Sequence, residues 1–444
     1  MVAAKPIVVV GLGKTGYSVV AFFAARNMPV VAMDTRDEPP FAQTILDNFP
    51  NVEMCLGKLD EIQLLKAEKV VVSPGLPLAT KEIKQAQDAG IEVVSDIQIF
   101  ADYAKAPIVA ITGSNAKSTV TTLVGLMAQD AGLHTAIGGN LGTPALDLID
   151  DSVQLYVMEL SSFQLEATPN LNPLVATVLN ISPDHLDRYD SYKDYYESKQ
   201  VIFNGAKWGV INLDDTLSAP MFAQPERMVG FTINEPENNQ FGVCKQAEKL
   251  YLCKGKELLL ESGLLKIKGS HNRSNALAAL ALGECAGLPM NSMLKTLSTF
   301  AGLEHRCQWV RKVNGVEFYN DSKGTNVGAT QAALEGLGPD IKGHIVLMAG
   351  GVGKDADFQC LSDQVKAYVS TLVVYGRDAQ LIADVLHQEC KVIQASSFED
   401  AFSKACESAK QDDAVLLSPA CASFDMFNSF EHRGETFVKL VEAS

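Results

Sequence analysis

The residues best suited to do chemistry are Lys117, Ser118 and Thr119, which begin a predicted helix. They follow the apolar run Val109–Ile111 and the small polar turn Gly113–Ala116. A strand that ends in such a turn directs successive backbone N–H groups at one anion, and the positive end of the helix adds to the attraction. Lys117 is then placed to reach the outer phosphates of a nucleotide, and the Ser118 hydroxyl to bind Mg²⁺. The stretch therefore predicts a phosphate-binding loop.

The match to the common pattern G-x-x-x-x-G-K-[ST] is incomplete, because Ile111 and Ala116 stand where that pattern has glycine. A plain strand, turn and helix capped by Ser114 or Asn115 is the alternative, although it does not explain why Lys-Ser-Thr follows. A left-handed backbone would cost Ala116 roughly 1–2 kcal/mol. We therefore expect Ala116 to be right-handed.

These residues need a strand and a helix to position them, and the N-terminus shows the same alternation. The strand Ile7–Val10 leads into the spacing G-x-G-x-x-G and a predicted helix Tyr17–Arg26, and the strand 29–34 ends on Asp34. This is the Rossmann fingerprint in its expected context, and it predicts a nucleotide-type ligand. An NAD(P)-dependent dehydrogenase is the alternative that it raises.

Length and composition narrow the class of protein. The 444 residues suggest about three domains, at roughly 100–200 residues each. A formal net charge of −16 disfavours nucleic acid or an anionic membrane as a partner. Nine cysteines without a C-x-x-C pair fit a reducing compartment better than a disulfide framework or a zinc site, and Cys421 fits a buried thiol better than a nucleophile. Since no apolar run reaches the length of a membrane span, we expect a soluble cytoplasmic protein.

Further polar residues follow strands of the middle region. Glu159 ends the predicted strand in LYVMELSS, where an acid often faces Mg²⁺, although a surface acid is the simpler alternative. Asp184, His185 and Asp187 lie in a loop before a helix that carries Lys199. They suggest contact with a metal or a substrate, and helix capping by Asp184 is the alternative.

The chain then passes through residues 206–268, where short apolar runs and polar turns predict β hairpins. An alanine-rich helix follows, with Asn272 and Asn275 in its first turns, where capping would explain them. Composition changes near residue 302. The expected domains are therefore 1–95, 96–302 and 303–444.

The last third returns to alternating strands and helices, with polar residues after each strand. Because the carboxyl ends of parallel strands meet at one edge of a sheet, these residues should share a rim. They are Asp321, Lys323, Thr325, Lys354, Ser423 and Arg433.

Together the ordered motifs resemble the Mur ligases, the ATP-dependent amino-acid ligases of peptidoglycan synthesis. The motifs that carry the resemblance span nearly the whole chain: GLGKTG, MDTR, SPG, TGSNAKST, GGNLG, ELSSFQLE, DHLDRY, HNRSNALAAL, HR, NDSKGTN, GGVGKDADF and SPACASFDMFNSFEHRG. The resemblance implies an α/β protein of three domains: an N-terminal Rossmann-like domain, a central P-loop-type ATP-binding domain and a C-terminal Rossmann-like domain. It also implies that the N-terminal domain holds a UDP group rather than NAD.

The resemblance assigns site residues by their place in these motifs. For the UDP substrate it implies Lys14, Thr15, Asp34, Thr35, Arg36, Gly75 and Asn140. For ATP it implies Gly113, Ser114, Asn115, Ala116, Lys117, Ser118, Thr119, Asn275, Arg306 and Asp321. For two Mg²⁺ ions it implies Ser118, Glu159, His185 and Lys199, the last as a carbamate derived from CO₂. For D-glutamate it implies Lys323, Thr325, Lys354, Ser423 and Phe430, the last through its backbone.

The implied reaction joins D-glutamate to UDP-N-acetylmuramoyl-L-alanine through an acyl phosphate, with Lys117, His185, Lys199 and Lys323 as the catalytic residues. The resemblance also implies a third domain that closes over the site, and Leu303–Cys307 is the expected hinge. We expect a monomer with small-molecule partners only. Three alternatives stay open: a folylpolyglutamate-type ligase, a dehydrogenase, and a sugar-nucleotide binder without catalysis, which Ala116 in place of glycine suggests.

Overall fold

The computed structural model describes residues 5–182, 188–353 and 356–444. His185, Asp184, Asp187 and Lys354 lie outside these residues. The chain divides into two compact units. The first comprises Met1–Lys245, Tyr251–Leu259 and Asn275–Thr296, and the second comprises Gln246–Leu250, Leu260–Ser274 and Leu297–Ser444.

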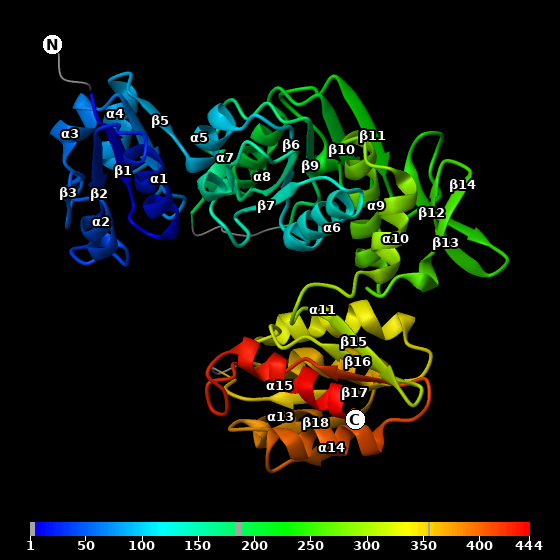
Figure 1. Cartoon of the computed structure of the whole chain (residues 1–444). Coiled ribbons are helices and arrows are strands. Elements are labelled where there is room, and N and C mark those ends of the chain that lie inside the picture. Colours follow the sequence, from blue (N-terminus) through cyan, green and yellow to red (C-terminus); the bar gives the residue numbers. More distant parts are fainter. Residues whose placement is uncertain (1–4, 183–187, 354–355) are drawn as a thin grey trace. The chain divides into compact units, whose positions relative to one another are not determined.

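A five-stranded parallel sheet forms the N-terminal part, in the order β3-β2-β1-β4-β5 (Figure 1). Its strands are β1 Ile7–Val10, β2 Val30–Met33, β3 Glu53–Cys55, β4 Lys69–Val72 and β5 Glu92–Val94. Its helices are α1 Lys14–Ala24, α2 Ala42–Asn48, α3 Glu61–Lys66 and α4 Lys81–Asp88. Alternate residues of β1 belong to two hydrophobic clusters, which explains why this strand is apolar throughout.

The first helix shows where the expected boundaries were wrong. Gly13 is extended and accepts a hydrogen bond from Tyr17 N, so α1 begins at Lys14 rather than at Tyr17 and ends at Ala24. Lys14 and Thr15 therefore lie in the first turn of a helix.

A nine-stranded sheet forms the middle part, in the order β14-β13-β12-β11-β10-β9-β6-β8-β7. Its strands are β6 Ile108–Thr112, β7 Thr135–Gly139, β8 Leu155–Glu159, β9 Val175–Val178, β10 Trp208–Asn212, β11 Arg227–Phe231, β12 Phe241–Gln246, β13 Lys249–Lys254 and β14 Glu257–Glu261. Its helices are α5 Asp96–Tyr103, α6 Lys117–Asp130, α7 Ser162–Leu165, α8 Tyr192–Gln200, α9 Ser270–Cys285 and α10 Met290–Thr299. Asn272 and Asn275 lie inside α9, so neither caps it.

A disulfide joins Cys244 of β12 to Cys253 of β13, with Cα atoms 6.2 Å apart. The expectation that the cysteines form no disulfide is wrong at this pair, because adjacent strands bring together residues nine positions apart. Cys421 is fully buried, as expected of a structural thiol, and burial raises its pKa to about 12.

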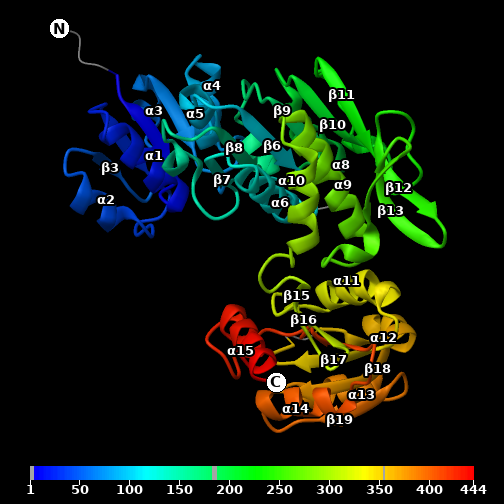
Figure 2. The same ribbon diagram turned by 45° about the vertical axis from the view of Figure 1, so that its right-hand side comes forward.

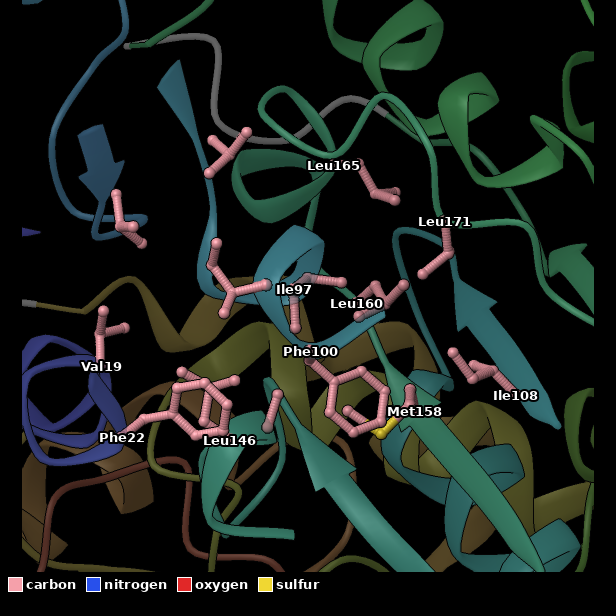
Figure 3. Packing of buried hydrophobic residues seen from close by; sticks show 14 of the residues in the cluster. Val19, Phe22, Ile97, Phe100, Ile108, Leu146, Met158, Leu160, Leu165 and Leu171 are labelled. Atoms are coloured by element: carbon pink, nitrogen blue, oxygen red, sulfur yellow. The ribbon is translucent and has the colours of Figure 1, made fainter. Parts of the chain in front are cut away.

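One hydrophobic cluster is shared by the N-terminal and middle sheets. Figure 3 shows Phe22 of α1, Phe100 of α5 and Met158 of β8 among its members. Phe100 packs edge-on against Tyr156, with ring centroids 4.9 Å apart. The two parts of the first unit therefore share a continuous core.

A six-stranded sheet forms the C-terminal part, in the order β15-β16-β20-β17-β18-β19, with only β15 antiparallel to its neighbour (Figure 2). Its strands are β15 Gln308–Val313, β16 Val316–Asn320, β17 Ile345–Gly350, β18 Val369–Tyr375, β19 Lys391–Gln394 and β20 Ala414–Leu417. Helices α11 Val327–Leu337, α12 Ser362–Tyr368 and α13 Ala379–Leu386 cover one face, and α14 Phe398–Ser408 and α15 Phe430–Ala443 the other.

Among the described residues, no helix combines the length and the apolar composition needed to cross a membrane.

Candidate active site

A cavity of about 510 Å³ opens at the carboxyl ends of β1, β2 and β4. It lies where the strand order reverses, between β1 and β4, which is the usual ligand position in open α/β sheets. All seven residues expected to hold the UDP substrate line it: Lys14, Thr15, Asp34, Thr35, Arg36, Gly75 and Asn140. Asn140 directly follows β7 of the middle sheet, so both parts of the first unit contribute to the cavity.

Asp34 organises the floor of this cavity. Its carboxylate accepts hydrogen bonds from the backbone N–H of Leu12 at 2.7 Å and from the Arg36 guanidinium at 2.8 and 2.9 Å. Burial raises the pKa of Asp34, but the hydrogen bonds from Arg36 and Leu12 outweigh burial and lower this pKa to about 2. The paired carboxylate holds the partly exposed Arg36 guanidinium at the cavity.

Hydrogen bonds between the middle and N-terminal parts of the first unit stabilise the walls of the cavity. Lys14 Nζ donates to the carbonyl of Gly142 at 2.8 Å. Arg188 donates to the carbonyls of Pro74 at 2.6 Å and Leu76 at 3.3 Å, and its guanidinium lies 3.9 Å from the Phe163 ring centroid. Arg188 thereby fixes the loop after β4 that lines the cavity.

The phosphate loop corrects the expectation for Ala116. This residue is the N-cap of α6 and has φ 66° and ψ −1°, which is left-handed, and no side chain caps the helix. The expected right-handed backbone is therefore wrong, and so is capping by Ser114 or Asn115. The loop turns from β6 into α6 within four residues, and this turn requires the conformation that glycine adopts without strain.

Residues after the neighbouring strand β9 fasten the loop. Asn180 accepts from the backbone N–H groups of Ser114 at 2.9 Å and Asn115 at 2.8 Å. The Ser114 hydroxyl donates to the carbonyl of Ser182 and pairs with the Tyr195 hydroxyl at 2.8 Å. The loop is therefore held in shape by the fold rather than by its own sequence alone.

Two lysines share one acceptor in this loop. Lys117 Nζ donates to the Gly113 carbonyl at 2.8 Å, and Lys199 Nζ donates to the same oxygen at 3.2 Å. Lys199 is almost fully buried and lies 4.8 Å from the Tyr195 ring centroid. The structure thus brings together two residues that are 82 positions apart in the sequence, with their amino groups within one hydrogen-bonded cluster.

Glu159 is buried at the end of β8 rather than exposed on the surface. One carboxylate oxygen accepts from the Asn140 amide at 2.7 Å, and the other is buried with no hydrogen-bond partner. An orphaned carboxylate oxygen fits a Mg²⁺ ligand. No three His, Cys, Asp or Glu side chains of the described residues could hold a metal together, so Mg²⁺ here would also need hydroxyl and phosphate oxygens.

In the second unit, Asp321 follows β16 and is buried. It accepts from the Ser418 hydroxyl at 2.7 Å and from Cys307 N at 3.0 Å. Burial raises its pKa to about 7, against the opposing effect of these hydrogen bonds and of the Arg306 and Arg433 charges. Asp321 therefore lies at the junction of β16, β20 and the segment before β15.

Lys323 and the start of α15 lie close together. Lys323 Nζ is 5.4 Å from the Phe430 ring centroid, and Thr325 N donates to the Lys323 carbonyl. Phe430 is the first residue of α15, where a backbone N–H has no partner within the helix. Ser423 is buried in the loop between β20 and α15.

Arg433 lies at the expected edge of the sheet, against the loops that follow β16 and β20. It is fully buried and donates to the Ser322 carbonyl and hydroxyl and to the Cys421 carbonyl, at 2.9 to 3.2 Å. As the fourth residue of α15, it lies against the loops that carry Ser322 and Cys421. It fixes the loop that carries Ser423 rather than facing a ligand.

The expected ATP residues are divided between the units. Gly113 to Thr119 and the buried Asn275 belong to the first unit. Arg306, which is exposed, and Asp321, which is buried, belong to the second. The loop Ser73–Gly75 lines the cavity, as its place after a strand predicts, whereas sequence reasoning missed Leu76, Gln164 and Arg188. Ser161 and Gln164 form a capping box at the start of α7. The Ser-x-x-Gln spacing therefore indicates the start of a helix and gives no sign that Gln164 lines a cavity.

Three family models match the chain. They are described as the MurD-like N-terminal domain of Mur ligases, over residues 5–95, the Mur ligase middle domain, over 111–283, and the glutamate ligase domain of Mur ligases, over 305–421. They cover the N-terminal, middle and C-terminal sheets in that order.

Whole-chain relatives agree. The UDP-N-acetylmuramoylalanine–D-glutamate ligases of Pseudomonas syringae pv. tomato and Pseudomonas aeruginosa are each 52% identical, over 98% of this chain and 97% of theirs. The enzyme of that name from Acinetobacter baylyi is 48% identical, over 98% of both chains.

Solved structures share the fold at low identity. UDP-N-acetylmuramate-alanine ligase MurC of Thermotoga maritima matches with a TM-score of 0.58 and 18% identity, over 99% of this chain and 100% of that chain. MurF of Acinetobacter baumannii matches with the same TM-score and identity, over 98% and 90%. The three domain models and the full-length relatives lead to one conclusion: this chain belongs to the Mur ligase family.

Proposed function

We propose that this protein uses ATP to join D-glutamate to UDP-N-acetylmuramoyl-L-alanine, in the synthesis of a peptidoglycan precursor. The observation that carries the proposal is the hydrogen bond between Asn140 and Glu159. Asn140 lines the cavity suited to a sugar nucleotide, and Glu159 is the buried carboxylate beside it with an orphaned oxygen. This contact joins the substrate cavity to the place where phosphate chemistry would occur.

The chemistry proceeds in two displacements. The substrate carboxylate attacks the γ-phosphorus of ATP, ADP leaves, and an acyl phosphate forms. The amine of D-glutamate then attacks the acyl carbon, inorganic phosphate leaves, and the amide forms. Both steps bring anions together, so the protein contributes mainly positioning and positive charge.

In the first unit, Lys14, Thr15, Asp34, Thr35, Arg36, Gly75 and Asn140 would hold the UDP substrate. The backbone N–H groups of the Gly113–Ala116 turn and the first residues of α6 would hold the ATP phosphates, with Asn275, Arg306 and Asp321 at the rest of the nucleotide. Lys117 would stabilise charge on the transferred phosphate.

Mg²⁺, when bound, neutralises charge between the phosphate and the carboxylate. Ser118 and Glu159 would hold one ion, and His185 and Lys199 a second. The fit rests on the orphaned Glu159 oxygen and on the first-turn position of Ser118 in α6.

Lys199 would act as a carbamate. Two ammonium groups that share the Gly113 carbonyl repel each other, and a buried ammonium also repels Mg²⁺. Carbamate formation at Lys199 would replace both repulsions with attraction and supply oxygen ligands. The neutral amine must react with CO₂ for this to occur.

D-glutamate would bind in the second unit, where two separated anion holders are needed for its two carboxylates. Lys354 with Thr325 would hold one, and Ser423 with the Phe430 N–H the other, with Lys323 nearby. Closure of residues 303–444 around Leu303–Cys307 would exclude water from the acyl phosphate. His305 and Cys307 in this segment have left-handed φ values of 61° and 43°.

We further propose the domain boundaries 1–95, 96–302 and 303–444, a cytoplasmic location and a monomeric state. The boundary at 95 is supported by Ser95, which caps α5 with its side chain.

The test is ADP release by the full chain with UDP-N-acetylmuramoyl-L-alanine and ATP, against a panel of amino acids. D-glutamate should give the fastest release. The chain lacks the Asp-Asn-Pro-Arg signature of the ligases that add diamino acids, so L-lysine and diaminopimelate should be poor substrates. Faster release with either would reject this branch of the family, and hydride transfer to NAD(P) without ADP release would reject ligation.

A further inference from the structure

A second cavity, of about 440 Å³, lies wholly within the second unit. It forms where the segment after β14 runs along β15 and β16. Its lining residues are Gly263, Leu264, Leu265, Lys266, Lys268, Trp309, Arg311, Lys312 and Glu317. None of them belongs to the sites described above, and we call it the basic cavity.

The basic cavity is strongly cationic. Four of its lining residues are lysine or arginine and one is a carboxylate, so the formal excess is three positive charges. The whole chain, by contrast, carries a formal charge of −16. A local excess of positive charge on an acidic protein attracts an anion, and the concave shape of the cavity concentrates the positive potential there.

Among the described residues, one ion pair to these cationic groups is recorded, from Lys312 to Glu317. Glu317 is an acceptor for the Tyr319 hydroxyl at 2.7 Å and lies 3.7 Å from Lys312 Nζ. Lys268 and Arg311 donate to the backbone carbonyls of Gly263 and Glu442, each at 3.2 Å, and these carbonyls carry no charge. In the part of the chain that the structure describes, these contacts place the cationic groups without pairing them with a second carboxylate.

Trp309 forms one wall and holds a lysine in place. Lys266 Nζ lies 4.4 Å from the Trp309 ring centroid, and the electrons of the indole ring attract the ammonium group at this distance. Leu265 is buried behind this segment. The cation at the aromatic wall is therefore positioned by the fold.

We propose that the basic cavity binds a small compound that carries two or more phosphate charges. The ammonium groups of Lys266, Lys268 and Lys312 are suitable donors to phosphate, and the volume suits a small molecule. The phosphates could belong to inorganic pyrophosphate or to a nucleoside diphosphate, which share this chemistry.

The test uses Trp309 as its reporter. The chain has two tryptophans, so Trp208→Phe in the full-length protein leaves fluorescence from Trp309 alone. Pyrophosphate is titrated at constant ionic strength, with UDP in a second titration and sulfate as the control. We expect a saturable change with pyrophosphate and a weaker response to sulfate. Tighter binding of UDP than of pyrophosphate would identify the nucleotide as the source, and the reverse order would identify the free phosphate compound.

Two variants locate the anion. Lys266→Gln with Lys268→Gln should weaken pyrophosphate binding at least tenfold, whereas Lys366→Gln with Lys391→Gln, at exposed positions of the same unit, should leave it within twofold. Lys117→Ala should also leave the signal unchanged. The proposal would be overturned if pyrophosphate caused no saturable change in fluorescence. It would also be overturned if both double variants lost pyrophosphate binding equally, or if Lys117→Ala lost the fluorescence change.

Discussion

Ala116 is the residue at which a single substitution tests the reasoning about the phosphate loop. Its left-handed backbone, at φ 66°, costs an L-residue roughly 1–2 kcal/mol relative to glycine. Ala116→Gly removes this strain, but glycine increases the conformational entropy of the unfolded chain, at a cost of about 0.4–1 kcal/mol. The net effect is a stabilisation of up to about 1.6 kcal/mol, with a central value near 0.8 kcal/mol.

The gain should appear as stability rather than as nucleotide affinity. The backbone of the loop is fixed by the hydrogen bonds of Ser114 and Asn115 to Asn180, so the strain belongs to the folded loop itself. For a domain of about 200 residues the central value corresponds to a rise in Tm of about 2–3 °C. The affinity for ATP should change by less than about threefold, or roughly 0.7 kcal/mol.

The assay is scanning calorimetry of the variant and the parent, together with an ATP titration of each. Ala131→Gly is the matched control, because Ala131 ends the same helix with a right-handed backbone at φ −77°. Glycine there should lower stability by about 0.4–1 kcal/mol. If Ala116→Gly lowers Tm as Ala131→Gly does, or tightens ATP binding about tenfold at unchanged Tm, the argument from a strained folded loop is refuted.

The remaining predictions concern catalysis, specificity and pH. Lys199→Ala should abolish most ligase activity, and a small carboxylate should restore part of it. With labelled bicarbonate, the parent should show a ¹³C carbamate signal that the variant lacks. Full activity in Lys199→Ala, or loss of activity in the exposed control Lys193→Ala, would contradict the role. Lys354→Ala should raise the KM for D-glutamate about tenfold to a hundredfold and leave the KM for ATP nearly unchanged, because a charge-assisted hydrogen bond contributes roughly 1.5–3 kcal/mol. Ser423→Ala should raise the KM for D-glutamate by less. Equal increases in the two KM values would argue against a D-glutamate contact. Burial raises the pKa of Asp96 to about 6, so its contribution to stability is present below about pH 4 and is lost as pH rises through 6. Asp96→Asn should therefore gain stability relative to the parent between pH 4 and 7, by on the order of 2 kcal/mol, in urea unfolding. A difference between variant and parent that does not change with pH would contradict the effect of burial.

Motifs that lie at strand ends could be found from the sequence. The seven residues expected at the UDP substrate do line one cavity, because each follows a strand of a parallel sheet or lies in the first turn of a helix. The same rule placed Glu159 at the end of β8. The three-domain α/β architecture followed from the resemblance, and the domain models and full-length relatives confirm it.

Features that depend on contacts between distant segments could not be found in this way. Ala116 is left-handed in a loop that Asn180 and Ser182, after another strand, bind through Ser114 and Asn115, and local preference predicted the opposite. Arg433 is fully buried against Ser322 and Cys421, and the polar pattern alone did not indicate this burial. Arg188 contacts the loop after β4 across 114 and 112 positions of sequence, and no local pattern indicates such a contact.

Transfer of oxygen from the substrate carboxylate to phosphate tests the central claim most directly. UDP-N-acetylmuramoyl-L-alanine with both carboxylate oxygens labelled by ¹⁸O is turned over with ATP and D-glutamate, and the inorganic phosphate is analysed by mass spectrometry. An acyl phosphate requires that each phosphate released carry one ¹⁸O atom, while the amide product keeps the other. Phosphate without ¹⁸O, formed together with the amide, would contradict the account.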